Sequence, residues 1–348
     1  MKAALVLEDG AVFEGFAFGK TGEAFGEAVF YTGVVGYQEV VTNPSYRGTL
    51  VVLTYPIIGS YGVNAEDSES PRAQASGVII RDCSSRYSNF RATGSFEEFL
   101  QKEGVVGVRG VDTRAITVHL REKGEMKAGI VSGDFDHAGV VARLKKNPSA
   151  FERDLAEDWS LALLGDGGKK LGLLDAGATR SLLSQLSDLG FGERKAVADM
   201  AAVAAAKPAG IIVAGGPGDP RSAKGAASAV KSAIGKMPVL GVGLGQGLVA
   251  LALGCKVSRM KVGHHGVNQS VRDIEAGKCI ITAQHHSFAV DATMPKGVEV
   301  THTNVNDGTV EGIRSRELRA RGFQFQPGRD DMGAPSAILD KFVKGQYA

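Results

Sequence analysis

Residues 238–254 read PVLGVGLGQGLVALALG and contain the pattern that decides the fold. A short apolar run, Val239–Val242, passes through glycines into an apolar segment of helical length that continues to Leu253. This order is typical of the turn between a buried strand and a helix. The apex of the turn is Gly243. A tight strand–turn–helix can present a nucleophile at its apex and aim helix N–H groups at an oxyanion, so this turn is a candidate site.

The second half of the chain repeats this alternation of apolar runs and helical segments. Apolar runs lie at residues 171–174 and 210–213, and helical segments lie at 179–189 and 222–234. Short strands that alternate with helices indicate βαβ units, and therefore a mostly parallel sheet with ligands at the carboxyl ends of its strands. We expect an α/β domain over residues 171–348.

The first half has a different pattern, which predicts an α+β domain over residues 1–150. Apolar or alternating runs flank an Asp-Gly turn at residues 9–10, as in a hairpin. Ser95 and Glu98 have the spacing of a capping box before a helix. Asp112 is placed to cap a second helix. The apolar positions of that second helix are Ile116, Val118 and Leu120.

Residues 151–170 separate the two halves. The segment ends in GDGGKK (165–170) and is rich in polar and turn-forming residues. Glycine-rich polar segments behave as flexible chain. We therefore expect a linker here.

The composition is that of an ordinary globular protein. Hydrophobic residues make up 43% of the chain, and 40 basic residues against 38 acidic ones leave a formal charge of +2. This balance argues against a nucleic-acid-binding surface, which needs clustered positive charge. No apolar run approaches the ~20 residues that span a bilayer, and Glu8 and Asp9 interrupt the N-terminal run too early for a signal peptide. We expect a cytoplasmic protein that binds neither nucleic acid nor membrane.

The cysteines and histidines do not predict a metal site. Cys83, Cys255 and Cys279 form no CxxC pair, so neither a disulfide framework nor a zinc site is indicated. Histidines are paired at 264–265 and 285–286. Adjacent residues on a strand point to opposite faces, so each pair offers one easy ligand, and no acidic cluster in the sequence completes a set.

Two glycine-rich turns are candidates for ligand binding. GVGLGQG (241–247) departs from the GxGxxG dinucleotide fingerprint, and Val267 stands where that fingerprint needs an acidic residue. Gly243 offers no nucleophile, because glycine has no side chain, but neighbouring N–H groups could bind an anion. The loop GGPGDP (215–220) could aim further N–H groups at a ligand. A plain turn without a ligand fits both local sequences equally well.

Longer stretches allow a comparison with known families. In the first half they are LEDGAVFEGFAFG (7–19), TGVVGYQEVVTNPSY (32–46), LTYPIIGSYGVN (53–64), SSRYSNFRA (84–92) and GVDTRAITVHLREKG (110–124). In the second half they are GGPGDP (215–220), GVGLGQGLVALALG (241–254), KVGHHGVNQSV (261–271), ITAQHHSFAVD (281–291) and FQFQPGRDD (323–331). Together they resemble the small subunit of carbamoyl phosphate synthetase, whose second half is similar to class I glutamine amidotransferases.

The resemblance implies an α+β domain of the small-subunit type, a linker and a glutamine amidotransferase-like domain. In that family a cysteine at the elbow attacks the side-chain amide of glutamine, a histidine activates the cysteine, and a glutamate orients the histidine. The ammonia passes to a large subunit, which makes carbamoyl phosphate from bicarbonate. ATP and Mg²⁺ are then expected on the large subunit, and no cofactor in this chain.

The catalytic positions of the family are changed here. An elbow that reads G-I-C-L-G-H-Q in the family is Gly-Val-Gly-Leu-Gly-Gln-Gly at residues 241–247. The resemblance therefore places the nucleophile at Gly243, the base at Gly328 and the acid at Asp330. Glycine can neither attack a carbonyl nor carry a proton, so we expect that no catalytic residue is intact.

The substrate pocket of the family is also changed. Gly247 stands where the resemblance implies a substrate-contacting glutamine, and His285 and Ser287 replace an asparagine and a glycine. The residues that the resemblance leaves in a glutamine pocket are Ser45, Gly216, Gly218, Leu244 and Phe288.

Three hypotheses follow. The first is a small subunit without glutaminase activity that supports an ammonia-using large subunit in carbamoyl phosphate synthesis, for pyrimidine or arginine biosynthesis. The second is a non-enzymatic regulator in which the N–H groups of Gly216 and Leu244 bind a small anion or an amino acid. The third is a glutaminase with a relocated nucleophile, for which Cys255 and Ser287 are the candidates.

Overall fold

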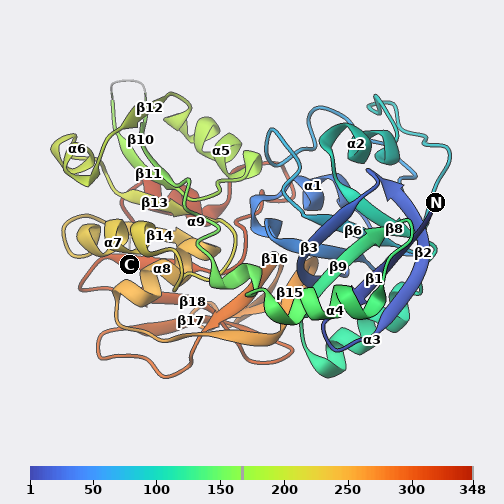
Figure 1. Ribbon diagram of the computed structural model, residues 1–348. Helices are drawn as coiled ribbons and strands as arrows, with labels where there is room; N and C mark the ends of the chain where they lie inside the picture. Colours follow the sequence, from blue (N-terminus) through green and yellow to red (C-terminus); the bar gives the residue numbers. More distant parts are fainter. Residues whose placement is uncertain (166–167, 347–348) are drawn as a thin grey trace. The chain divides into compact units, whose positions relative to one another are not determined.

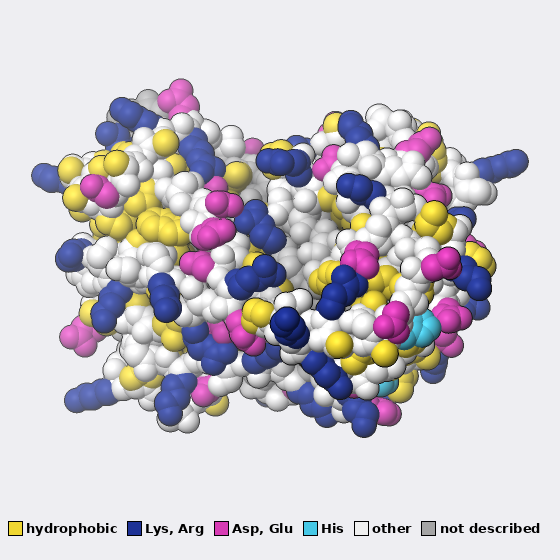
Figure 2. Space-filling view, in the orientation of Figure 1, with side chains coloured by type: hydrophobic (Ala, Val, Ile, Leu, Met, Phe, Trp, Pro, Cys, Tyr) yellow, Lys and Arg dark blue, Asp and Glu magenta, His cyan; other side chains and the backbone are white. Residues whose placement is uncertain are grey.

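The protein folds as two compact units (Figure 1). The computed structural model describes residues 1–165 and 168–346. The first unit contains Met1–Arg153 and Lys261–Gly266, and the second contains Asp154–Met260 and Val267–Ala348. On the face drawn in Figure 2, basic and acidic side chains are interspersed over both units. Among the described residues, no helix has the length and apolar character needed to cross a membrane.

The first unit is built on a closed barrel with strand order β1-β2-β8-β6-β4-β3-β9. Its strands are β1 (Lys2–Leu7), β2 (Val12–Gly19), β3 (Glu23–Tyr31), β4 (Thr49–Leu53), β6 (Gly77–Ile80), β8 (Val106–Arg109) and β9 (Met126–Ser132). A short pair, β5 (Ile57–Ile58) and β7 (Asp82–Cys83), lies outside the barrel. Strands β3, β4, β6 and β8 run parallel to one another, so their carboxyl ends meet at one edge.

Short helices accompany the barrel. They are α1 (Tyr37–Thr42), α2 (Phe96–Glu103), α3 (Thr113–Lys123) and α4 (His137–Lys146), with 3-10 turns η1 (Pro44–Tyr46) and η2 (Ala150–Glu152). Alternate residues of β4 face two apolar clusters: Val51 and Leu53 pack with α1 and α2, whereas Leu50 and Val52 pack with α3. This period of two is what a strand buried on both faces requires.

Several local predictions for the first unit are confirmed. The runs beside residues 9–10 pair as the antiparallel strands β1 and β2. Ser95 and Glu98 form the capping box of α2, and the Asp112 carboxylate accepts a hydrogen bond from the Ala115 N–H at the start of α3. The apolar face of α3 is corrected at one position. Ile116 and Leu120 are buried, but Val118 is 37% exposed, because residues four apart share a helix face and the residue between them does not.

The second unit contains one ten-stranded sheet of order β12-β10-β11-β13-β14-β19-β18-β16-β15-β17. Its strands are β10 (Ser160–Leu164), β11 (Leu171–Asp175), β12 (Arg194–Val197), β13 (Ile211–Ala214), β14 (Val239–Val242), β15 (Val257–Asp273), β16 (Lys278–Val290), β17 (Glu299–Asn304), β18 (Val310–Ser315) and β19 (Ala320–Phe323). The strands β11, β13, β14 and β19 are parallel, which confirms the predicted mostly parallel core, and the outer strands pair antiparallel.

Helices cover both faces of the parallel strands. They are α5 (Arg180–Leu186), α6 (Met200–Ala205), α7 (Lys224–Ala233), α8 (Leu244–Ala252) and α9 (Ala337–Val343), with a π-helical turn η3 (Ser187–Phe191) after α5. Leu173, Ile212 and Leu240 form one apolar cluster with α5 and α9. The neighbouring strand residues face the other side, where α8 packs on β13 and β14. The two-sided burial explains why these strands read as continuous apolar runs.

The linker expected at residues 151–170 is wrong at residues 160–164, which form a strand. Residues 160–164 form β10, which pairs with β11 and β12 and buries Leu161 and Leu164. This segment forms a strand because the sheet buries the apolar side chains of SLALL and removes them from water. The polar and glycine-rich residues around it do not prevent this. Residues 166 and 167 of the GDGGKK stretch, and the last two residues of the expected C-terminal domain, lie outside the described residues.

Candidate active site

The turn between β14 and α8 has the geometry of a nucleophile elbow. Gly243 joins the strand to the helix with φ 59° and ψ −122°, a left-handed conformation that side-chain-bearing residues adopt only under strain. Its N–H donates to the Phe323 carbonyl at 2.9 Å, and its carbonyl accepts from the Gln246 N–H at 2.9 Å. These bonds fix the apex between β19 and the first turn of α8, which confirms the predicted strand–turn–helix.

The apex has room for a side chain but none is present. A Cβ on residue 243 would lie 3.6 Å from both Gln326 Nε2 and Gly215 Cα. Chain neighbours aside, the described residues place nothing else within 4 Å of that point. A carboxamide and a backbone carbon therefore face the apex, and no thiol, hydroxyl or imidazole lies that close. No local pattern in the sequence distinguishes Gln326, which lies at the turn with its N–H donating to the Ala283 carbonyl at 2.9 Å.

Two backbone N–H groups remain beside the apex. Among the described residues, neither the Gly216 N–H nor the Leu244 N–H has a protein acceptor. The two residues are close, because a Cβ on Gly216 would lie 3.0 Å from Leu244 Cδ2. The same Cβ would lie 2.4 Å from the Ala176 carbonyl oxygen, so only glycine fits at 216. The structure thus keeps donors of the kind that bind an anion at a helix start.

Pro220 fills the space beside Gly247. A Cβ on residue 247 would lie 2.7 Å from Pro220 Cγ and 2.9 Å from Pro220 Cβ. A proline ring cannot rotate away, so any larger residue at 247 forces the backbone to shift. The position at which the resemblance implies a substrate-contacting glutamine is therefore closed to a side chain. The sequence shows Pro220 only as part of a turn and gives no signal of this contact.

The side chain of Phe288 is covered. The Arg221 guanidinium carbon lies 5.7 Å from the centroid of the Phe288 ring, in cation–π contact. Arg221 is held in turn by the Asp219 carboxylate, with Nη2 donating at 2.6 Å and Nε at 2.9 Å. Leu155 lies against Gly218, 3.3 Å from the point where a Cβ of residue 218 would be. Phe288 and Gly218 thus pack against this chain's own residues.

The expected base and acid positions lie on a fixed loop after β19. The buried Gln185 Nε2 donates to the Pro327 carbonyl at 2.8 Å, which anchors the residue before Gly328. A Cβ on Gly328 would meet nothing within 4 Å. Asp330 Oδ1 accepts from the Met332 N–H at 3.0 Å and from the Ala334 N–H at 2.8 Å. Asp330 therefore closes a local turn.

Cys255, one of the two replacement nucleophiles proposed from sequence, is not activated. Cys255 is buried beyond the end of α8, with its Sγ 3.9 Å from Met294 Sδ, and burial raises the pKa of its thiol. A raised pKa lowers the thiolate fraction that reacts. His286 has Nδ1 2.9 Å from the Phe288 carbonyl oxygen and Nε2 3.2 Å from Gln284 Oε1, so its ring is engaged in the sheet.

Ser45, the remaining residue of the implied pocket, belongs to the first unit. It lies in η1, and its N–H donates to Asn43 Oδ1 at 3.0 Å. The other four pocket residues, Gly216, Gly218, Leu244 and Phe288, belong to the second unit.

Family comparisons match both halves of the chain. The model for "Carbamoyl-phosphate synthase small chain, CPSase domain" matches residues 5–130, and the model for "Glutamine amidotransferase class-I" matches residues 173–344. A carbamoyl phosphate synthase small chain from Akkermansia muciniphila is 40% identical over 344 residues, covering 94% of this chain and 92% of the relative. One from Clostridium perfringens is 39% identical over 347 residues and covers 99% of both chains.

Solved structures give a weaker likeness. A glutamine amidotransferase from Methylobacillus flagellatus aligns with a TM-score of 0.31 at 15% identity, covering 43% of this chain and 77% of that protein.

The contact between residues 220 and 247 predicts that Gly247→Ala destabilises the protein, whereas Gly→Ala in a helix usually stabilises it. Gly→Ala inside a helix usually stabilises it by about 0.5–1 kcal/mol, but Gly247→Ala will lower the free energy of unfolding by about 1–3 kcal/mol, because the new methyl group overlaps the Pro220 ring. Urea denaturation of the full chain measures it. Gly328→Ala is the control and will change the free energy by less than about 0.5 kcal/mol. Additivity between Gly247→Ala and Pro220→Gly in a double-mutant cycle would contradict the contact.

Proposed function

The chain belongs to the family of carbamoyl phosphate synthase small chains, and we propose that it serves as a small subunit with no glutaminase activity of its own. The apex of the β14–α8 turn carries the proposal. Residue 243 is glycine, and the nearest groups to its missing side chain are a carboxamide and a backbone carbon. Covalent hydrolysis of an amide needs a nucleophile at this point and a base beside it.

The proton acceptor of that route is missing as well. Gly328 has no side chain, and the Asp330 carboxylate is occupied by backbone N–H groups of its own loop. Catalytic groups that act as a unit typically contribute on the order of 10⁶ in turnover, and binding together with oxyanion stabilisation leaves a small residual rate. The retained N–H groups of Gly216 and Leu244 could provide only that residual part.

Recognition of glutamine is proposed to be weak for a separate reason. Pro220 closes the space beside Gly247, and Arg221 covers the ring of Phe288. A ligand that needed either space would have to displace packed side chains, which costs free energy. The changes therefore affect binding as well as chemistry.

In this proposal the protein pairs in the cytoplasm with a large synthase subunit that holds ATP and Mg²⁺ and uses free ammonia. Its product, carbamoyl phosphate, would serve pyrimidine or arginine biosynthesis. The first unit supports the pairing, because it matches the small-chain-specific family model over residues 5–130 and folds as an intact barrel. A stand-alone protein would have no need of that unit. The replaced catalytic positions, Gly243 and Gly328, lie in the second unit.

A second role is favoured by one observation, the pair of N–H groups at Gly216 and Leu244. Backbone N–H donors near a helix start attract a carboxylate or another small anion. The protein could then act as a regulator that senses an amino acid or a small anion without turning it over.

The loss of glutaminase activity is tested by reconstitution with the large subunit from the same organism. Ammonium will support carbamoyl phosphate synthesis, and glutamine will support none above background, because no nucleophile stands at the apex. The assay follows carbamoyl phosphate formed from each nitrogen donor. Glutamine-dependent synthesis that disappears when Cys255→Ser or Ser287→Ala is introduced would instead establish a relocated nucleophile and refute the proposal.

Introducing a cysteine at 243 and a histidine at 328 will raise kcat for glutamine hydrolysis without lowering KM. Gly243→Cys with Gly328→His will raise kcat for glutamine hydrolysis by at least about a hundredfold over the unmodified protein, because both positions have space for a side chain. KM will stay high, since Pro220 is unchanged. The matched control, Gly243→Ser with Gly328→His, keeps the volume but lacks the thiol. Equal activity of the serine and cysteine pairs would contradict the assignment of residue 243.

The regulatory role predicts ligand-dependent stabilisation without any partner. Glutamate or glutamine at millimolar concentration will raise Tm in a thermal shift assay. Leu244→Pro removes the N–H at a helix position where proline is tolerated, and it will abolish the shift. Leu244→Ala keeps the N–H and will retain the shift. No shift in the unmodified protein, or an equal shift in both variants, would exclude this role.

A further inference from the structure

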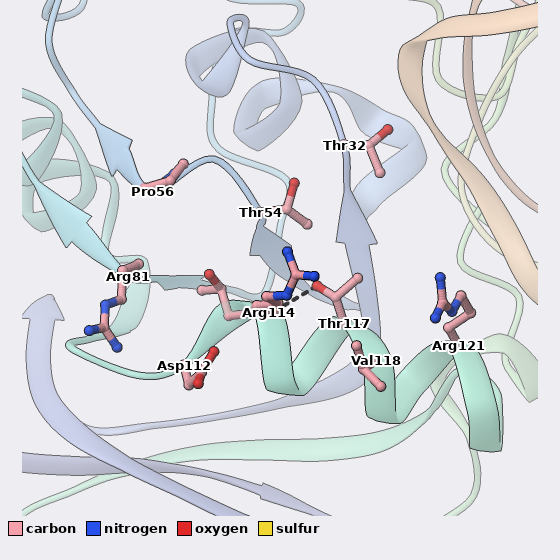
Figure 3. Close-up of a pocket in the computed structure, with 10 residues that line it drawn as sticks. Thr32, Thr54, Pro56, Arg81, Asp112, Arg114, Thr117, Val118 and Arg121 are labelled. Carbon is pink, nitrogen blue, oxygen red and sulfur yellow. Dashed lines mark hydrogen bonds between the residues drawn. The ribbon is translucent and has the colours of Figure 1, made fainter.

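A cavity of about 640 Å³ opens in the first unit at the carboxyl ends of its parallel strands. Thr32 directly follows β3, Thr54 follows β4, and Arg81 follows β6. The chain after β8 leads through Asp112 into α3, which forms the remaining wall (Figure 3). Ligands of parallel sheets bind at this edge, where successive strands deliver side chains to one place. The cavity is unrelated to the turn at Gly243, which lies in the other unit.

The cavity is lined by three arginines. Arg114 and Arg121 lie two helical turns apart on one face of α3, and Arg81 comes from the end of β6. Figure 3 shows the Arg114 guanidinium above the first turn of α3, between Arg81 on one side and Arg121 on the other. Of the described residues that line the cavity, Asp112 alone is acidic, and its Oδ1 accepts from the Ala115 N–H at 2.9 Å.

The guanidinium groups of these arginines are unpaired in the described part of the chain. Within residues 1–165 and 168–346, neither an ion pair nor a hydrogen bond involves the side chain of Arg81, Arg114 or Arg121. Some arginines of the same unit are paired, as Arg91 is with Asp67 at 3.0 Å and Arg143 with Glu23 at 2.9 Å. Positive charges that line one cavity without a counter-charge attract anions to it.

Hydroxyl groups line the cavity beside the arginines. Thr113 lines it, and the Thr113 hydroxyl makes no hydrogen bond within the described part of the chain, so it is available to a ligand. The neighbouring hydroxyls of Thr117 and Thr54 donate to the carbonyls of Thr113 and Tyr31, and their lone pairs stay open. Arginine and threonine side chains together are the usual set for holding phosphate oxygens.

We propose that this cavity binds a small molecule that bears phosphate groups. Its volume falls within the ~300–1,000 Å³ of small-ligand sites. Three guanidinium groups against one engaged carboxylate match a ligand with more than one negative charge. The planar donors of arginine suit phosphate and carboxylate alike, so a polycarboxylate is a necessary comparison. The cavity lies in the first unit and Gly243 lies in the second, so ligand binding in the cavity is independent of glutamine hydrolysis at Gly243.

Calorimetry with inorganic pyrophosphate as the probe tests the proposal on the full chain. Pyrophosphate will bind the unmodified protein more tightly than citrate, and affinity will fall as salt is raised. Arg114→Gln, and Arg81→Gln with Arg121→Gln, will each weaken binding about tenfold or more, since each loses charge-assisted hydrogen bonds. Thr113→Val removes only the hydroxyl and will weaken binding about two- to tenfold.

A control separates this cavity from a general loss of positive charge. Arg86→Gln removes an exposed arginine of the same unit that does not line the cavity, and it will leave the affinity unchanged. Pyrophosphate binding that fails in the unmodified protein, or that weakens equally in Arg86→Gln, overturns the proposal. Tighter binding of citrate overturns the choice of phosphate.

A further experiment tests the alternative that the three arginines bind an acidic protein surface. If Arg114→Gln weakens association with the large subunit tenfold while pyrophosphate does not bind, the arginines serve protein docking and the proposal is wrong. If pyrophosphate binds the isolated protein and Arg114→Gln weakens that binding, the small-molecule site stands.

Discussion

The second unit depends on a single-residue change of direction at Gly243, where a buried parallel strand becomes a helix. The backbone reaches φ 59° there and is kept in place by bonds to Phe323 and Gln246. Such a conformation persists only where surrounding structure over-determines it. In this protein the surroundings preserve the turn although no nucleophile stands on it. The backbone of an elbow and the chemistry of its apex are therefore separable: sheet and helix packing maintain the first, and side chains alone supply the second.

Local signals in the sequence predicted local structure well and long-range pairing poorly. The capping box at Ser95 and the cap at Asp112 are set by residues three apart, so they could be read directly. The closure of the barrel could not, because β9 must pair with both β1 and β3, which are distant in sequence. Strand β10 could not be predicted for a related reason. SLALL is a short apolar run between polar residues, and it becomes a stable strand only because it pairs with β11 and β12.

The candidate sites likewise contain residues that the sequence identifies and residues that only the fold brings together. Gly243 and Gly328 stand out in the sequence because a resemblance fixes which side chains to look for. Pro220 and Gln326 do not, since each matters only through a neighbour brought close by the fold. The cavity in the first unit is a further case. Arg114, Thr117 and Arg121 share a helix face that spacing alone reveals, but Arg81 joins them only through the parallel order of β6 and β8.

The ring of Pro220 against Gly247 has a consequence for how this protein could change over time. A larger side chain at 247 and a proline at 220 compete for the same space, so the two positions constrain each other. A substitution at 247 becomes less costly once residue 220 has changed. The order in which the two residues change therefore decides how much stability each step loses.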